Sequence, residues 1–229
     1  MNILAIDTAD QVFSVALETA AGLLYTEIDS GSRHSELLME SVDWLCKKSG
    51  IKPAELELVA CMKGPGSFTG LRIGFSAAKG MALALKIPLV TAPTLDCLAY
   101  PLSKWPGIVI PAMEAKKGCF FSALYRDGKR LTDYMDASPE TLAEELEKAR
   151  LGPEERIILT GCGAEMLSSR LDGLPSMHNM VYPDCRSGGA KALLKIIKCS
   201  ILEVKRDDIN SGPTYLRKSD AEIKMAGIK

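Results

Sequence analysis

The sequence predicts an α/β protein of two lobes, each with a mixed sheet and helices. Two observations lead to this fold class. Short apolar runs of strand length alternate with longer stretches of helical periodicity along the 229 residues. The order of these elements in the first half recurs in the second. A chain of this length can bury one large core or two small ones.

The first half begins with three short strands and continues with alternating helices and strands. The run Ile3-Leu4-Ala5-Ile6 is apolar and stops at Asp7, which is typical of a buried strand. Gly50 marks the end of the first helix. The predicted elements of this half are strands at 2–7, 12–18, 23–28, 56–62 and 88–91, and helices at 35–49 and 71–85.

The second half repeats this order. Asp127-Gly128 predicts a tight turn between two strands, and Ser138 predicts a helix start. The predicted elements are strands at 107–112, 118–126, 131–135 and 156–160, and helices at 138–149 and 188–204. Three meandering strands followed by crossover helices, present twice, form the ribonuclease-H-like and actin-like (ASKHA-type) topology. We therefore expect an N-terminal actin-like lobe at 1–105 and a C-terminal actin-like lobe at 106–229.

The composition predicts a cytoplasmic protein whose net charge creates no strong electrostatic field. Hydrophobic residues make up 47% and charged residues 25%, and the formal net charge is −1, so no global charge attracts nucleic acid or anionic membrane. The seven cysteines contain no Cys-x-x-Cys pair and read as buried thiols in a reducing compartment. The N-terminal run lacks the basic flank of a signal sequence, and no apolar run approaches the roughly 18 residues that span a bilayer.

The glycine turn Gly64-Pro65-Gly66-Ser67-Phe68-Thr69-Gly70-Leu71-Arg72-Ile73-Gly74 looks like a phosphate loop. A Walker-type loop ends in Gly-Lys-Ser/Thr, whereas Leu71 and Arg72 follow Gly70 here. The glycines therefore serve either a nucleotide or close packing. The residues that define this motif are Gly64, Gly66, Ser67, Thr69 and Arg72.

Asp7 and Thr8 occupy the position of a phosphate turn that has degenerated. In actin-like ATPases an acid and a glycine turn at this place hold magnesium and phosphate, because backbone N–H groups there face the anion. This turn lacks the glycine and hydroxyl pairing, so we favour Asp7 and Thr8 as caps of their own turn. The two histidines form no His-x-x-x-His pair and no nucleophile elbow occurs. We predict no catalytic residue, metal or cofactor.

The two helices of the first half carry more apolar or small-residue surface than one buried face requires. The apolar arc of helix 35–49 covers roughly 220°, where about 100° suffices. Gly70, Gly74 and Ala78 recur every four residues, which calls for a close approach by a helix of the same chain or of a partner. We favour a partner, so that a bulky residue at Gly74 or Ala78 should abolish pairing and leave the monomer folded. The predicted interface is Leu37, Leu38, Met39, Val42, Gly70, Gly74, Ala77, Ala78 and Met81.

Four segments together resemble the bacterial TsaB (YeaZ) family in order and spacing. These are Ile3-Leu4-Ala5-Ile6-Asp7-Thr8-Ala9, Arg33-His34-Ser35-Glu36-Leu37-Leu38, the glycine turn, and Pro213-Thr214-Tyr215-Leu216-Arg217. The resemblance implies a non-catalytic subunit of the complex that transfers threonylcarbamoyl to adenosine next to the tRNA anticodon. It implies pairing with TsaD, which carries the metal and the transferase chemistry, and assembly with the ATPase TsaE. It further implies a homodimer when TsaD is absent, and contact with tRNA only through the complex.

Two enzyme alternatives stay open at this point. The first is a diverged actin-like ATPase or sugar-kinase relative that uses Asp7 and the glycine turn. The second is an endopeptidase, which the missing catalytic residues disfavour.

Overall fold

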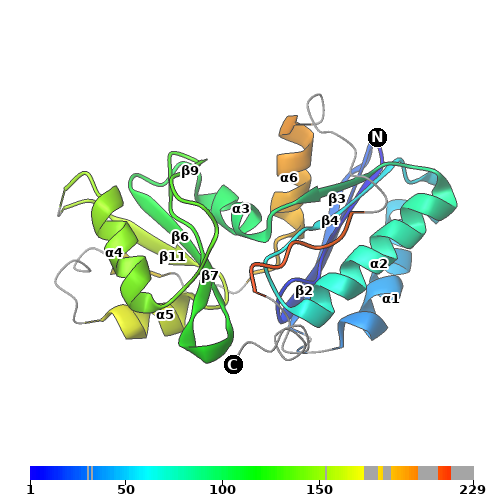
Figure 1. The fold of residues 1–229 in the computed structure, drawn as a ribbon. Coiled ribbons are helices and arrows are strands. Elements are labelled where there is room, and N and C mark those ends of the chain that lie inside the picture. Colours follow the sequence, from blue (N-terminus) through cyan, green and yellow to red (C-terminus); the bar gives the residue numbers. More distant parts are fainter. Residues whose placement is uncertain are drawn as a thin grey trace.

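The computed structural model consists of two lobes placed side by side, with the short helix α3 between them (Figure 1). It describes residues 1–29, 31, 33–152, 154–172, 180–182, 187–200 and 211–217. His178, Cys185 and the predicted helical residues 201–204 lie outside these ranges. None of the helices in the described ranges combines the length and apolarity that a bilayer crossing would need.

The first lobe is a five-stranded sheet in the order β3-β2-β1-β4-β5. The first three strands pair antiparallel, and β1, β4 and β5 run parallel. Helices α1 and α2 pack on one face of this sheet and α6 packs on the other. The bounds are β1 Ile3–Asp7, β2 Val12–Thr19, β3 Gly22–Asp29, α1 His34–Ser49, β4 Leu58–Met62, α2 Phe68–Leu85, β5 Leu89–Ala92 and α6 Ala190–Ser200.

The second lobe repeats this arrangement in the strand order β10-β7-β6-β11-β12. Helices α4 and α5 cover one face, and α3 packs against β6 on the other. The bounds are α3 Thr94–Ala99, β6 Ile108–Glu114, β7 Phe120–Ser122, β8 Tyr125–Arg126, β9 Lys129–Arg130, β10 Met135–Ala137, α4 Pro139–Ala149, β11 Ile157–Thr160, α5 Ala164–Leu171 and β12 Met180–Val181. Short 3₁₀ turns lie at Pro53–Glu55, Tyr100–Leu102 and Lys116–Gly118. The duplicated actin-like fold class is thereby confirmed.

Several elements differ from the prediction. The expected strand 118–126 is divided into β7 and β8, and β8 makes a small hairpin with β9 around Asp127 and Gly128, whose φ angles are 51° and 72°. Helices α3 and α5 were missed, because six and eight residues are too few for a helical period to stand out. Helix α2 begins at Phe68 rather than at residue 71, since the Ser67 side chain accepts a hydrogen bond from the Gly70 N–H and caps the helix.

A division of the chain near residue 105 remains our proposal. The two sheets lie on either side of this position, but α6 comes from beyond it and packs on the first sheet. One hydrophobic cluster joins residues of α6, α3 and both sheets. The lobes therefore share part of one core.

The small-residue stripe of α2 packs inside the chain. A Cβ at Gly70 would lie 2.0 Å from the backbone oxygen of Thr8, and one at Gly74 would lie 2.3 Å from Thr8 Oγ1. The same hydroxyl donates a hydrogen bond to the Gly70 carbonyl over 2.8 Å. The close approach is thus made by the β1–β2 turn, which corrects the prediction that Gly70 and Gly74 face a partner.

Three further residues of the predicted interface lie in the core of the first lobe. Leu38 and Val42 are each 2% exposed and Ala78 is fully buried. They pack with alternate residues of β1 and β2 in one cluster. These side chains hold α1 and α2 on their own sheet, so the prediction is corrected for them as well.

The other four residues of the predicted interface are partly exposed to solvent. Met39 is 53% exposed, while Leu37, Ala77 and Met81 are half-buried at the edge of the core. Trp44 on α1 is also 48% exposed. Helix α1 therefore does expose apolar side chains, but over a narrower arc than the sequence predicted.

Replacing Gly70 by alanine should destabilise the folded chain. The added methyl group would overlap the Thr8 carbonyl oxygen, so Gly70→Ala should lower the free energy of unfolding by about 1–3 kcal/mol. For the same reason Gly74→Leu should destabilise the monomer instead of leaving it folded. Urea unfolding of each variant measures these changes.

Gly80→Ala is the matched control on the same helix. Gly80 is exposed and a Cβ there meets nothing within 4 Å. This variant should raise the free energy of unfolding by about 0.5–1 kcal/mol, because alanine favours helix over glycine. Equal gains from Gly70→Ala and Gly80→Ala would contradict the packing assigned to Gly70.

Candidate functional site: the cleft between the lobes

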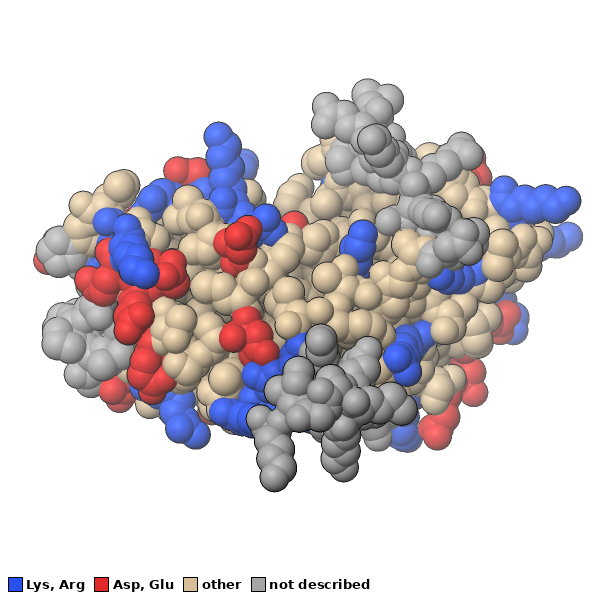
Figure 2. Space-filling view, viewed as in Figure 1, with Lys and Arg blue, Asp and Glu red and all other residues tan. Residues whose placement is uncertain are grey.

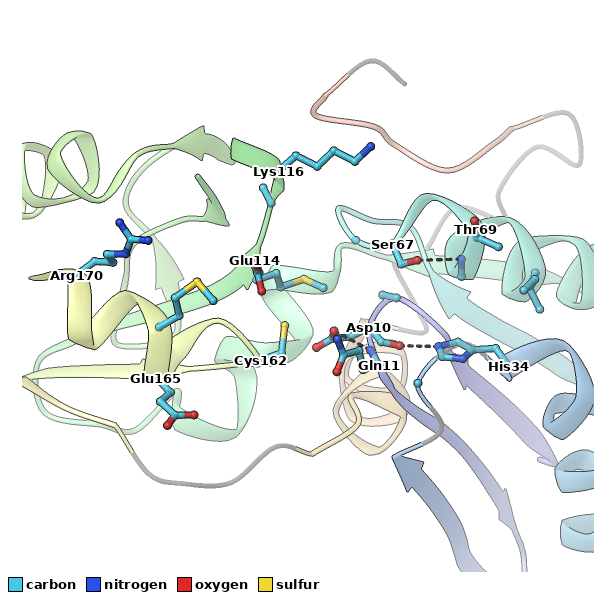
Figure 3. A pocket seen from close by; sticks show the side chains of 18 of the residues that line it. Asp10, Gln11, His34, Ser67, Thr69, Glu114, Lys116, Cys162, Glu165 and Arg170 are labelled. Atoms are coloured by element: carbon cyan, nitrogen blue, oxygen red, sulfur yellow. Dashed lines mark hydrogen bonds between the residues drawn. The ribbon is translucent and has the colours of Figure 1, made fainter. Parts of the chain in front are cut away.

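A cleft of about 770 Å³ lies between the lobes. Figure 3 shows Asp10, Gln11 and His34 approaching it from the first lobe, and Glu114 and Cys162 from the second. The glycine turn and the first turn of α2 form its upper wall. In the actin-like fold this is where the phosphate turns of the two lobes face each other.

Asp7, at the end of β1, is buried and is not among the residues that line the cleft. Its Oδ1 accepts a hydrogen bond from the Ala9 N–H over 2.9 Å, and its Oδ2 accepts one from the Gly189 N–H over 2.7 Å. The cap of its own turn that the sequence favoured is therefore present for Asp7. Thr8 instead donates to Gly70 on α2, as described above.

Burial raises the pKa of Asp7 to about 6, and the N–H groups of Ala9 and Gly189 offset part of this rise. Burial disfavours the charged carboxylate, whereas hydrogen bonds donated to it favour the charge. Asp7 is thus a structural acid held between β1 and α6. Each of its two oxygens accepts one backbone hydrogen bond from the chain itself.

The start of α6 is held by side chains from the three antiparallel strands. The Gly188 N–H donates to Glu27 Oε2 over 3.1 Å, the Gly189 N–H to Asp7, and the Ala190 N–H to Ser14 Oγ over 3.1 Å. The free N–H groups at a helix N-terminus are a common binding place for phosphate. Here the chain's own oxygens accept from three N–H groups that lead into α6.

Sequence reasoning missed this attachment, although signals for it exist. Ser14 is a fully buried polar residue within an otherwise apolar strand, which calls for a hydrogen-bond partner. Gly188-Gly189 precedes an apolar helix, and a Cβ at Gly188 would lie 2.3 Å from the Ser14 side chain. A paired glycine ahead of a helix therefore indicated a close approach to the sheet.

The glycine turn packs against the β1–β2 turn. A Cβ at Gly66 would lie 2.5 Å from the Ala9 carbonyl oxygen, and the Ser67 N–H donates to that oxygen over 2.7 Å. Gly64 has a φ of 104° and lies against the Thr214 carbonyl oxygen. These glycines permit close backbone contacts within the chain.

Thr69 and Arg72 extend the glycine motif to the surface. Thr69 is exposed at the wall of the cleft. The Arg72 guanidinium lies 3.8 Å from the centre of the Phe68 ring, and its Nε donates to the Tyr215 hydroxyl over 3.2 Å. Arg72 is therefore engaged beside the glycine turn rather than aimed into the cleft.

The floor of the cleft carries acids of both lobes without a metal site. Asp10, Glu114 and Glu165 line it, and among the described residues no group of three or more His, Cys, Asp or Glu could hold a metal ion. His34 Nε2 donates to the Asp10 carbonyl oxygen over 2.6 Å and ties α1 to the β1–β2 turn. Burial raises the pKa of the Cys162 thiol, which keeps this group in its unreactive protonated form.

Asp7 should make the protein more stable as the pH falls through the range from about 6 to 3.8. The folded state binds the proton before the unfolded state does, so the free energy of unfolding rises as pH decreases in this window. A difference of about two pKa units corresponds to about 3 kcal/mol.

Urea unfolding of wild type and Asp7→Asn at several pH values isolates this contribution. Other titrating groups cancel in the difference between the two proteins. The difference should move in favour of wild type by about 3 kcal/mol across the window. Parallel pH profiles would show that Asp7 is not the titrating group.

Comparisons with known proteins agree with this geometry. The family model described as TsaD: tRNA N6-adenosine threonylcarbamoyltransferase matches residues 28–167, more than half of the chain. The chain is similar to the tRNA threonylcarbamoyladenosine biosynthesis protein TsaB of Bacillus subtilis, with 33% identity over 129 residues, 55% of this chain and 56% of the relative. The Escherichia coli protein of the same name is 34% identical over 129 residues, 55% of each chain.

The sequence match spans little more than half the length of these curated relatives. A solved structure, YeaZ from Pseudomonas aeruginosa, covers 94% of this chain and 99% of its own with a TM-score of 0.78. At 22% identity this likeness concerns the fold. The family model covers more than half of the chain, and the relatives named above are TsaB proteins: the chain belongs to the TsaD-type family.

Proposed function

We propose that this chain is a non-catalytic subunit of the complex that transfers threonylcarbamoyl to adenosine next to the tRNA anticodon. The observation that carries the proposal is the attachment of α6 to the first sheet. Asp7 accepts a hydrogen bond from the Gly189 N–H just ahead of α6, and in an ATPase of this fold groups at this place would face magnesium and phosphate. The family to which the chain belongs supports the choice of reaction.

The same contacts count against the alternative of an independent ATPase or sugar kinase. The glycine turn brings no lysine to the cleft, and its backbone is packed against Ala9. Asp10, Glu114 and Glu165 line the cleft together with Lys116 and Arg170, so this lining has no surplus of positive charge to attract a triphosphate.

The partner we propose is TsaD, and the surface is the outer side of α1 and α2. Met39 is 53% exposed, and Leu37, Ala77 and Met81 lie half-buried beside it or on the neighbouring helix. Where described atoms are visible, the surface over α2 in Figure 2 is largely uncharged, with some Lys and Arg and no Asp or Glu. Exposed apolar side chains next to a tight core favour a protein partner.

The other partners follow from the same proposal. A second copy of the chain would use this surface when TsaD is absent, and TsaE would join the larger assembly. Contact with tRNA would occur only through the complex, since the chain has a formal net charge of −1. A role in tRNA modification supports a cytoplasmic location.

Met39→Glu should weaken binding to TsaD by about 10- to 100-fold, because it places a charge in an apolar contact. Size-exclusion chromatography and calorimetry with TsaD measure the change. Leu131→Glu is the matched control, since Leu131 is 42% exposed on the second lobe. Equal binding by wild type and Met39→Glu would contradict the proposed interface. Failure of the wild type to bind TsaD would contradict the proposed function.

The isolated chain should not bind ATP with magnesium. Isothermal titration at millimolar nucleotide should give no saturable heat, and the unfolding temperature should not change. Tight binding of ATP would raise the unfolding temperature by mass action. This result would favour the alternative that the chain is an ATPase.

A further inference from the structure

Residues 211–217, which we call the strap, run from the glycine turn of the first lobe to the sheet of the second (Figure 1). Figure 3 shows the same segment passing over the edge of the cleft near Ser67 and Lys116. Together with the glycine turn and Phe121 it encloses a second cavity of about 480 Å³. The strap therefore contacts both lobes at the mouth of the cleft.

The first lobe holds the strap by close backbone and ring contacts. The Thr214 N–H donates to the Lys63 carbonyl over 2.7 Å. A Cβ at Gly64 would lie 2.4 Å from the Thr214 oxygen, so the glycine makes room for the strap. The Tyr215 ring lies 4.8 Å from the Phe68 ring, and its hydroxyl accepts from Arg72.

Arg217 holds the strap to the second lobe with three hydrogen bonds. Its Nε and Nη2 donate to the two carboxylate oxygens of Asp136 over 2.5 and 2.6 Å, and its Nη1 donates to the Lys116 carbonyl over 2.6 Å. The two side chains are 23% and 18% exposed. A two-pronged pair of this kind fixes direction as well as distance.

A separate link joins the lobes through α3. Its Asp96 accepts hydrogen bonds from the hydroxyls of Tyr125, at 2.5 Å, and Tyr134, at 2.9 Å, both from the second lobe. Leu95 and Cys97 of the same helix lie in the core shared by both lobes. This buried link is suited to act as a pivot, whereas the strap ties the cleft at its mouth.

We propose that the strap is a latch that fixes the angle between the lobes, and that Arg217–Asp136 is its releasable end. The end on the first lobe combines a backbone hydrogen bond, a ring contact and a close fit at Gly64. The end on the second lobe rests on one guanidinium. Loss of that group frees the lobes to turn about α3 and widens the cleft, while the first end stays attached.

The test measures the distance between the lobes by double electron–electron resonance. Spin-labelled non-natural residues at Lys48 on α1 and Glu144 on α4, both exposed, avoid the native thiols. Arg217→Ala should shift the distance distribution to longer and broader values. Arg217→Lys should give a smaller shift, because lysine retains the positive charge but cannot donate two parallel hydrogen bonds to one carboxylate.

Arg126→Ala is the matched control. Arg126 makes the same set of bonds within the second lobe, two to Glu155 at 2.8 and 2.9 Å and one to the Ala149 carbonyl at 2.7 Å. It should cost stability and leave the distance unchanged. An unchanged distance in Arg217→Ala, or an equal shift in Arg126→Ala, would overturn the latch.

Hydrogen exchange at Thr214 tests which end is released. In Arg217→Ala this amide should keep its protection, because its bond to Lys63 belongs to the first lobe. Exchange faster by tenfold or more would mean that the whole strap detaches, and Arg217 would not be the releasable end. Should Arg217→Ala fold poorly, Asp136→Ala removes both acceptor oxygens of the pair and must also lengthen the distance.

Discussion

The rest of the structure depends on three hydrogen bonds by which Asp7, Ser14 and Glu27 hold the N–H groups that lead into α6. Each acceptor comes from a different strand, so the helix is fixed at one position on the sheet. That position lets the apolar side of α6 cover the face of the sheet opposite α1 and α2. Burial of Asp7 is a consequence of this arrangement, and two donated hydrogen bonds offset part of its cost.

The same kind of self-contact recurs around the cleft. The backbone of the glycine turn is bonded to the neighbouring β1–β2 turn, since the Ser67 N–H donates to the Ala9 carbonyl. The groups beside the cleft thus hold the chain together. Because these contacts stiffen the sheet from within, the outer sides of α1 and α2 are presented by a rigid support, which a docking surface requires.

Much of the fold could be predicted from sequence, because strand and helix periods repeat in the same order in both halves. The stripe at Gly70 and Gly74 correctly indicated a close approach, but sequence spacing cannot tell which element approaches. The residue that approaches the stripe is Thr8, which lies more than sixty residues away in the chain. The attachment of α6 was missed for the same reason: it joins residues about 180 positions apart, and its signals at Ser14 and Gly189 are single residues.

The position of α6 also has a consequence for how the chain is made. The five strands of the first sheet leave the ribosome early, whereas α6, which covers one face of that sheet, is the last helix that the structure describes. Until α6 emerges, the apolar residues it covers, among them Ile3, Ala5 and Ala16, face solvent. The residues synthesised first are therefore among the last to be enclosed, and this apolar face stays uncovered from the synthesis of β5 until that of α6.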